Sequence, residues 1–415
     1  MAERVVITGI GCVSCFGMGH RLFIDAIGSG CSGIAPITRF DTTECRSHRA
    51  ATIRDFDPAA FISPLKLRRV DAVGRVALAC TRLLLEDAGS VPGAGGRDDI
   101  GIALGTFTAG LDSLVEYLGG LSEHGPTGVP AILFSNTVSN APASLCAIEF
   151  GLRGPNVTFN QREASSLGAL VFSVGAIRQG RTTAMITGGA DCVEETFFRV
   201  HDRFRALSPM RGDRGGGAEA ARPFDRDRNS FILGEGGFLL LVESASAADA
   251  RGARVYGEIV GVGATASKTA LNGWPADSGG LASAMRLALS DAGLRADADR
   301  IAGVVGTSNG SPVLDRQEAD AIVSVFGSRS IPVASVKGAV GESGASGAAG
   351  LIAGLLSIAG GTLVPTAGFL QPDPALAVCV SSRPQQTRGD TFLVNSVASG
   401  GTNYSLAVRA TPGRS

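Results

Sequence analysis

The 415 residues carry a formal net charge of −1 and contain no long basic run, so the composition gives no support for binding to nucleic acid or to a membrane surface. The first residues, MAERVVITGIG, lack a charged leader followed by an apolar region, and no apolar run is long enough to span a bilayer. We therefore expect a cytoplasmic protein whose partners include neither nucleic acid nor a membrane. The hydrophobic content of 44% and the mean hydropathy of +0.22 indicate a large core or an obligate oligomer.

Short apolar runs alternate with longer helical patterns along the chain, which predicts an α/β fold with a mainly parallel sheet covered on both faces. In the first part the expected strands lie at 5–10, 101–104, 157–159, 184–187 and 238–242. After Ser246 the pattern starts again, with expected strands at 255–262, 303–305, 333–335, 392–398 and 404–408. The segments GIALGTFTAG (101–110) and AGVVGTSNGS (302–311) are alike, which is a weak sign of internal duplication.

Eight cysteines lie at positions 12, 15, 31, 45, 80, 146, 192 and 379, without the regular spacings of a disulfide framework. We expect them to be small buried side chains. Cys12 and Cys15 form a CxxC pair, but no second cysteine or histidine pair accompanies it. The pattern therefore favours a glycine-rich loop at a strand end over a metal or redox site, and no metal site is expected.

Residues 157–170, VTFNQREASSLGAL, have the pattern of a strand that runs into a helix through a tight turn. The turn-forming run GLRGPN (151–156) precedes the strand. Small residues at 164–166 let the helix begin close to neighbouring backbone, with free N–H groups aimed at position 163. A turn of this kind usually presents a nucleophile, and here it presents Glu163.

Four further motifs spread this pattern over nearly the whole chain. They are RVVITGIGCVS (4–14), RPFDRDRNSFILGEGG (222–237), SVKGAVGESGASGAAG (335–350) and NSVASGGTN (395–403). Together with the Ala-Ser-Ser-Leu run after Glu163, they resemble the β-ketoacyl synthases, the condensing enzymes of fatty acid and polyketide assembly. The resemblance implies a thiolase-like five-layered αβαβα fold built from two similar halves, and it implies no cofactor. We place the division after residue 250, which gives halves 1–250 and 251–415.

In this family a cysteine takes the acyl chain as a thioester, and two histidines promote decarboxylation of the malonyl extender. Aligned on the motifs, Glu163 stands at the cysteine, Thr307 at the first histidine and Glu342 at the second, while Lys337 matches the family lysine. All four histidines, at 20, 48, 124 and 201, precede both histidine motifs, so neither motif can supply an imidazole. Because a carboxylate that attacked a thioester would form a mixed anhydride of higher energy, we expect no acyl transfer through Glu163.

The two acids at these positions need something to balance their charge. We hypothesise that Lys337 lies between or beside Glu163 and Glu342, because two close carboxylates without a cation would push one toward its neutral form. The alternative is that both acids simply fill a vacated pocket. Gln161 invites comparison with the glutamine that replaces the cysteine in several non-condensing relatives, but it falls two positions early in the Ala-Ser-Ser-Leu register.

A ketosynthase pattern without its catalytic residues is similar to that of the chain length factors, the ketosynthase-β subunits of type II polyketide synthases. The resemblance implies a heterodimer with an active ketosynthase, or a higher assembly of such pairs, with the acyl carrier protein served through the ketosynthase. It also implies a tunnel at the interface that limits chain length. The candidate tunnel residues are Thr108, Leu111, Leu114 and Tyr117, at spacings that place them on one helix face. They fit equally well as ordinary interface or core residues.

A second function stays open, a decarboxylase that converts malonyl carrier protein to acetyl carrier protein for priming. This reaction needs only binding and a polarised thioester carbonyl, and the N–H groups of the turn with the backbone N–H of Ser399 could form an oxyanion hole. Against it, charged Glu163 and Glu342 would repel malonate, and both histidines are missing. A free-standing condensing enzyme is the least expected function.

Overall fold

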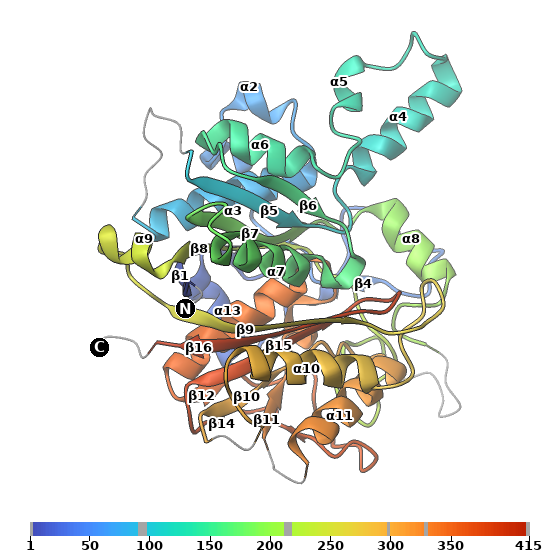
Figure 1. Ribbon diagram of the computed structural model, residues 1–415. Helices are drawn as coiled ribbons and strands as arrows, with labels where there is room; N and C mark the ends of the chain where they lie inside the picture. The colour runs from blue at the N-terminus through green and yellow to red at the C-terminus, as the bar shows by residue number, and fades with distance from the viewer. Residues whose placement is uncertain (1–2, 90–97, 211–217, 297–298, 328–330, 412–415) are drawn as a thin grey trace.

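The computed structural model describes residues 3–89, 98–210, 218–296, 299–327 and 331–411. These residues form five layers, which Figure 1 shows in the order helix, sheet, helix, sheet, helix from top to bottom. The expected five-layered fold built from two similar halves is therefore confirmed. Each of the expected strands overlaps a strand of the structure.

The first sheet contains the strands of the N-terminal half in the order β6-β5-β7-β8-β1. The first three of these strands are parallel, whereas β8 is antiparallel to both of its neighbours. Their bounds are β1 Val5–Ser14, β5 Ile100–Gly105, β6 Asn156–Phe159, β7 Ala184–Asp191 and β8 Gly236–Ser244.

The second sheet repeats this arrangement in the order β11-β10-β15-β16-β9, with β13 added beyond β11. Here β16 is the strand that lies antiparallel to both neighbours. The two sheets thus share one strand order, which supports the duplication that the like segments indicated. The bounds are β9 Gly257–Ala266, β10 Ile301–Val305, β11 Pro332–Ala334, β13 Cys379–Val380, β15 Thr391–Val397 and β16 Thr402–Ala410.

The two sheets are joined edge to edge, because residues 5–7 of β1 pair antiparallel with residues 257–259 of β9. From β7 through β8, β1, β9 and β16 to β15 every pairing is antiparallel, and parallel pairs occur only on the two flanks. The expectation of a mainly parallel sheet was therefore wrong. Apolar runs locate strands but not their direction, and the short turn 398–401 between β15 and β16 leaves no room for the crossover that a parallel pair needs.

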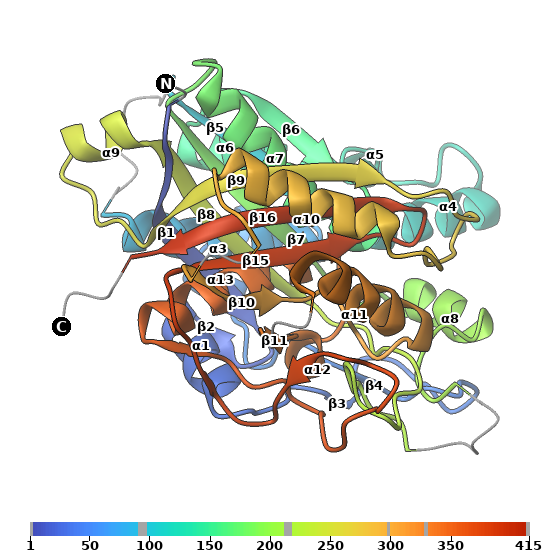
Figure 2. The same ribbon diagram turned by 60° about the horizontal axis from the view of Figure 1, so that its bottom comes forward.

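The middle layer consists of two helices, one from each half. The helix α13 is apolar all round and almost entirely buried, as a helix enclosed by two sheets must be. The outer layers cover the other faces of the sheets, as Figures 1 and 2 show. The middle helices are α7 (Ser165–Arg178) and α13 (Ser346–Ala359); the outer helices are α3 (Ala72–Asp87) and α6 (Ala141–Phe150) on the first sheet, and α10 (Gly279–Asp291) and α11 (Pro312–Phe326) on the second.

Two helices, α4 (Leu111–His124) and α5 (Ala131–Phe134), form an arm that projects from the first half (Figure 1). None of the helices in the described ranges is long and apolar enough to cross a membrane. The helix α9 (Ala245–Ala250) ends the first half, and we keep the division after residue 250 as a proposal. The remaining elements are α1 His20–Gly28, α2 Pro64–Leu67, α8 Glu195–Arg203, α12 Lys337–Val340, the 3₁₀ turns η1 Pro58–Ala60 and η2 Arg162–Ala164, and the short strands β2 Gly17–Met18, β3 Ala35–Pro36, β4 Arg49–Ala50, β12 Thr362–Leu363 and β14 Gln385–Gln386.

The cysteines are only partly as expected. Those at 12, 15, 80, 146 and 192 are buried free thiols, and Cys45 is half-buried. Cys31 and Cys379 are exposed, so the expectation was wrong for these two. Cys31 follows the end of α1, and Cys379 lies on β13, the short strand at the border of the second sheet.

Candidate functional site

The turn at position 163 is the 3₁₀ turn η2, which leads directly into α7. Arg162 has φ +55°, in the left-handed region that costs a residue other than glycine roughly 1–2 kcal/mol. The Ser165 hydroxyl holds the turn, because its Oγ accepts the Gln161 N–H at 2.9 Å and donates to the Arg162 carbonyl at 2.6 Å. The turn therefore has a fixed shape that buries the side chain of Glu163.

The first N–H groups of α7 do not point freely at position 163, contrary to expectation. The Ala164 N–H bonds to the Gln161 carbonyl at 3.2 Å, and the Ser166 N–H bonds to the Gly344 carbonyl at 2.9 Å. The Ser166 Oγ in turn accepts the Ala348 N–H at 3.1 Å. These bonds tie the start of α7 to the start of α13, so the two middle helices meet at the site.

Glu163 is only 3% exposed, and Ser399 is its hydrogen-bond partner. The Ser399 backbone N–H donates to Oε2 at 2.9 Å, and the Ser399 hydroxyl lies 2.9 Å from Oε1. Burial, reinforced by the charge of Glu342, raises the pKa of Glu163 to about 7, while the bonds from Ser399 and the backbone N–H of Glu163 itself oppose the rise. The Ser399 N–H proposed for an oxyanion hole is thus already occupied by this carboxyl group.

The side chain of Arg162 extends from the turn to two loops. Its Nη1 donates to the carbonyl oxygen of Ser399 at 2.9 Å and to the Ser399 Oγ at 2.8 Å. Its Nη2 donates to the Oδ1 of Asn272. The guanidinium also lies 5.6 Å from the ring centroid of Phe107, within cation–π range. Arg162 and Glu163 therefore both hold Ser399, Arg162 at its carbonyl and hydroxyl oxygens and Glu163 at its N–H and hydroxyl groups.

Lys337 forms a buried ion pair with Glu342. The Lys337 Nζ lies 2.8 Å from the Glu342 Oε2, and both side chains are at most 3% exposed. The Asn309 amide donates to the same oxygen at 2.6 Å, and the Ser346 hydroxyl donates to Oε1 at 2.9 Å. The hypothesis that Lys337 lies beside a carboxylate is confirmed for Glu342. Within the described residues its ammonium makes no hydrogen bond to Glu163.

Gly341 sets the direction of Glu342. Its φ is +73°, and a Cβ at this position would lie 2.7 Å from the Leu233 carbonyl, so only glycine fits. The following N–H, that of Glu342, donates to the Ile232 carbonyl at 2.8 Å. The turn thus aims the Glu342 side chain at Lys337.

Thr307, which we expect at the position of the family's first histidine, has a hydroxyl oxygen that accepts two hydrogen bonds. The Oγ1 accepts the Lys337 Nζ at 3.3 Å and the Val397 N–H at 3.1 Å. The Thr307 backbone N–H donates to the buried Glu318 at 2.9 Å, and Glu318 also accepts the Asn395 amide at 3.1 Å. A threonine held in this way is a structural hydroxyl and supplies no base.

One histidine lies near the site although it belongs to neither motif. His201, on α8, has its ring 4.2 Å from the Phe197 ring and 6.1 Å from the Phe107 ring, centroid to centroid. Its Nδ1 lies 2.9 Å from the Phe197 carbonyl, and burial lowers the pKa of the imidazole. Sequence reasoning missed this residue, because only the docking of α8 against Phe107 brings it here.

A cavity of about 10 Å³ lies beside the ion pair, lined among others by Asp191, Cys192 and Glu342. One oxygen of Asp191 accepts the N–H and hydroxyl groups of Thr108, whereas Oδ2 is buried without a partner among the described residues. Burial raises the pKa of the Asp191 carboxyl and raises that of the Cys192 thiol well above its usual range. The nearby sulfur is therefore a neutral thiol and not a nucleophile.

The candidate tunnel residues do not all lie on one helix. The helix α4 begins at Leu111, so Thr108 precedes it and is held at its base by Asp191. Leu114 is 37% exposed, and Tyr117 packs against Phe134 of α5 at 5.9 Å between ring centroids. The expectation of a single helical face was therefore wrong for Thr108. The other three residues lie on the projecting arm.

The chain matches two domain models of one known family. The β-ketoacyl synthase N-terminal domain matches residues 2–248, and the C-terminal domain matches residues 256–370. The chain belongs to the β-ketoacyl synthase family. It is 31% identical over 414 residues to the 3-oxoacyl-[acyl-carrier-protein] synthase 2 of Synechocystis, with 98% of each chain covered. It is 34% identical over 430 residues to the tetracenomycin polyketide synthase ketoacyl synthase alpha subunit of Streptomyces glaucescens, with 99% of this chain and 97% of the relative covered.

Among solved structures, this β-ketoacyl synthase family member is similar to the ishigamide ketosynthase/chain length factor, with a TM-score of 0.89, 30% identity and 100% of both chains covered. The relatives named as synthases match over the same length, so overall similarity does not separate condensing from non-condensing members. From the motifs we expect the difference at three positions, Glu163, Thr307 and Glu342.

Proposed function

We propose that this chain is a non-condensing subunit that pairs with an active ketosynthase in a type II polyketide synthase and sets the length of the product chain, as a chain length factor does. The product of this synthase could be a polyene. The observation that carries the proposal is Glu163, a buried carboxyl group with its partners already in place at the position of the acyl acceptor. Attack by this group on a thioester would give a mixed anhydride and would first require breaking its bonds to Ser399.

The two positions of the family histidines support the same conclusion. Thr307 accepts two hydrogen bonds, and Glu342 is paired with Lys337, so neither group is free to activate malonate. The imidazole of His201 packs against the rings of Phe107 and Phe197. The chain keeps the frame of a ketosynthase without the groups that perform its chemistry.

The arm of α4 and α5 is the surface that we assign to the partner. Exposed apolar side chains are common singly, but here they gather on one projecting element, which is unusual for a surface in water. In the sheet order β6 is an end strand, with one edge unpaired by any described strand, and such an edge can pair with another chain. The exposed large apolar residues of the arm are Leu114, Val115, Leu118, Ile132 and Phe134.

The decarboxylase alternative is weaker, because the oxyanion hole it needs would have to form at Ser399. That N–H donates to Glu163, and an incoming thioester oxygen would have to displace a carboxyl group that is bound within the same chain. The ionised fraction of Glu163 and the charge of Glu342 would also oppose the carboxylate of malonate.

The test uses the chain alone and co-expressed with a ketosynthase of the family that retains its cysteine and both histidines. We expect a stable complex of the two in size-exclusion chromatography, and polyketide from malonyl carrier protein only with the pair. The chain alone is expected to release no carbon dioxide from malonyl carrier protein and to acquire no acyl group by mass spectrometry. Glu163→Gln is expected to leave product formation by the pair intact. Unaided acylation or extension would overturn the proposal, and unaided release of carbon dioxide would favour the decarboxylase.

A further inference from the structure

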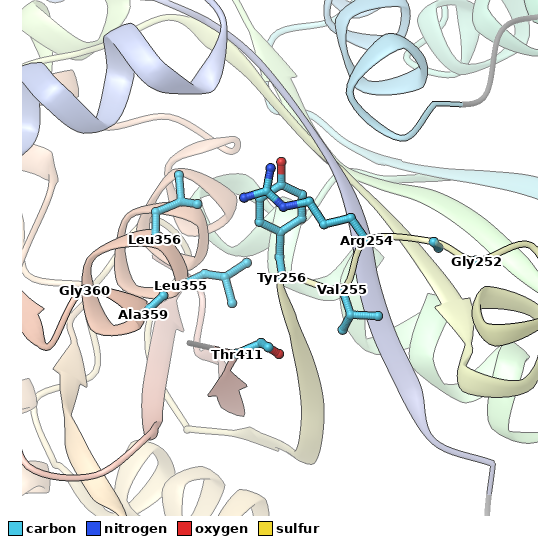
Figure 3. Close-up of a pocket in the computed structure, with 10 residues that line it drawn as sticks. Gly252, Arg254, Val255, Tyr256, Leu355, Leu356, Ala359, Gly360 and Thr411 are labelled. Atoms are coloured by element: carbon cyan, nitrogen blue, oxygen red, sulfur yellow. The ribbon is translucent and has the colours of Figure 1, made fainter. Parts of the chain in front are cut away.

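A second cavity, of about 900 Å³, lies at the end of α13 away from Glu342. Its volume is in the range of small-molecule sites in proteins. Because α13 rises about 1.5 Å per residue and the cavity begins at residue 355, the two sites are separated by roughly 15–20 Å along the helix. Figure 3 shows the lining residues that face one another across this space.

One wall of this cavity is apolar. Leu355, Leu356 and Ala359 of α13 face the loop that precedes β9, which contributes Val255 (Figure 3). Thr411, just after the end of β16, lies below them. The aliphatic wall suits a hydrocarbon body, since it offers dispersion contacts and no hydrogen-bonding group.

The opposite wall carries a cation that is held in place. The Arg254 guanidinium lies 4.4 Å above the ring of Tyr256, and Figure 3 shows it stacked there. The Tyr256 hydroxyl donates to Asp87 at 2.8 Å, and the other oxygen of Asp87 accepts the Ile10 N–H at 2.8 Å. The ring that supports Arg254 is thus anchored, so less side-chain entropy remains to be lost when the guanidinium binds an anion.

The charge around this wall is positive. Arg21 and Arg254 lie near Tyr256 and Asp87, and burial lowers the pKa of the nearby His20, which favours its neutral form, so the positive charge comes from the two arginines. Asp87 is the carboxylate they surround, and its oxygens are already engaged by Tyr256 and Ile10. Arg254 itself is exposed and has no carboxylate partner within the described residues. An exposed guanidinium without a carboxylate partner can form a bidentate pair of hydrogen bonds with a carboxylate or a phosphate.

We propose that this cavity binds a small amphipathic anion, with a hydrocarbon body against Leu355, Leu356 and Ala359 and a carboxylate or phosphate monoester head on Arg254. The apolar wall gives no hold to an inorganic anion, and the guanidinium gives no advantage to a neutral alcohol. None of the residues that line this cavity belongs to α4, α5 or β6, the elements that we assign to the partner surface, so the proposed site does not depend on the proposed pairing with a ketosynthase.

The test is isothermal titration calorimetry on the full chain with decanoate, decyl phosphate, decanol and inorganic phosphate. Decanoate or decyl phosphate is expected to bind, the tighter of the two identifying the head group, while decanol and inorganic phosphate bind at least about tenfold more weakly. Arg254→Met is expected to lower the affinity about tenfold or more, because it removes a charge-assisted pair. Arg68→Met, at another exposed arginine, is the matched control and is expected to have no effect.

A second variant tests the apolar wall without touching the charge. Ala359→Phe fills the cavity and is expected to abolish binding while leaving the melting temperature close to that of the wild type, because residue 359 lies at the end of α13 and is half-buried. Absence of binding by the wild type would overturn the proposal. So would binding that neither Arg254→Met nor Ala359→Phe weakens, or decanol binding as tight as that of decanoate.

Discussion

Glu163→Gln keeps the shape of the side chain at the centre of the site and removes its proton equilibrium. The pKa of Glu163 is raised from 4.5 to about 7, mainly because the group is buried. A difference of one pKa unit corresponds to about 1.4 kcal/mol, so the full shift corresponds to about 3 kcal/mol of folding free energy. Ionised Glu163 therefore costs the folded state about 3 kcal/mol relative to the unfolded chain.

The sign follows from which state binds the proton more tightly. The folded protein holds the Glu163 proton up to a higher pH than the unfolded chain does, so stability falls as the pH rises from about 4.5 to about 7. The glutamine variant does not lose stability in this way, because glutamine does not titrate. Its free energy of unfolding relative to the wild type is thus expected to rise by about 3 kcal/mol between pH 4.5 and pH 8. Asp315 and Glu194, whose pKa values are also raised to about 7, titrate in both proteins and cancel in the difference.

The assay is urea unfolding of the wild type and the variant at a series of pH values from 4.5 to 8. Glu86→Gln, at an exposed position on α3, controls for the loss of one negative charge. A difference between wild type and Glu163→Gln that does not change with pH, or that grows toward acid, would refute the reasoning from burial. It would mean that the bonds from Ser399 hold the carboxylate as well as water does.

Three more predictions address the rest of the site. Lys337→Met leaves Glu342 buried without its cation and is expected to cost about 3–5 kcal/mol in urea unfolding; a loss under about 1 kcal/mol would show that the ion pair is dispensable. Leu114→Ala, in the co-expressed pair, is expected to lengthen the product measured by mass spectrometry, and an unchanged product would remove Leu114 from the tunnel wall. Glu163→Cys is expected to react slowly with iodoacetamide and much faster when Arg162→Ala is added, because Arg162 fixes the loop around Ser399; equal rates would show that Arg162 does not restrict access.

The sequence was sufficient for the positions of the strands, because they depend on local patterns, whereas the three replaced catalytic positions remain a prediction from motif spacing. It was insufficient for strand direction, since the direction of β8 and β16 depends on how the chain returns to the sheet. The hydrogen-bond partner of Glu163 also could not be predicted from the sequence. Ser399 lies 236 residues away in the chain, and nothing in its own motif indicates that its N–H meets a carboxyl group. The pairing of Lys337 with Glu342 could be predicted because the two residues are only five positions apart in the chain.

His201 shows a different limit. A histidine on the amphipathic helix α8 has no motif around it, and its place beside Phe107 follows from packing alone. Thr108 shows the same limit on a smaller scale, because the spacing that suggested a helix face did not reveal that the helix begins three residues later.

Glu163 and Glu342 occupy corresponding places in the two halves, each just ahead of the middle helix that its half contributes. The repeated architecture thus places these two side chains near each other, so the charge of one acts on the other. The two positions therefore cannot change independently. A mutation that alters the charge at one of them changes which side chains are tolerated at the other. Under the proposed function, in which the partner ketosynthase supplies the chemistry, combinations of side chains at these two positions that would inactivate a condensing enzyme become tolerable.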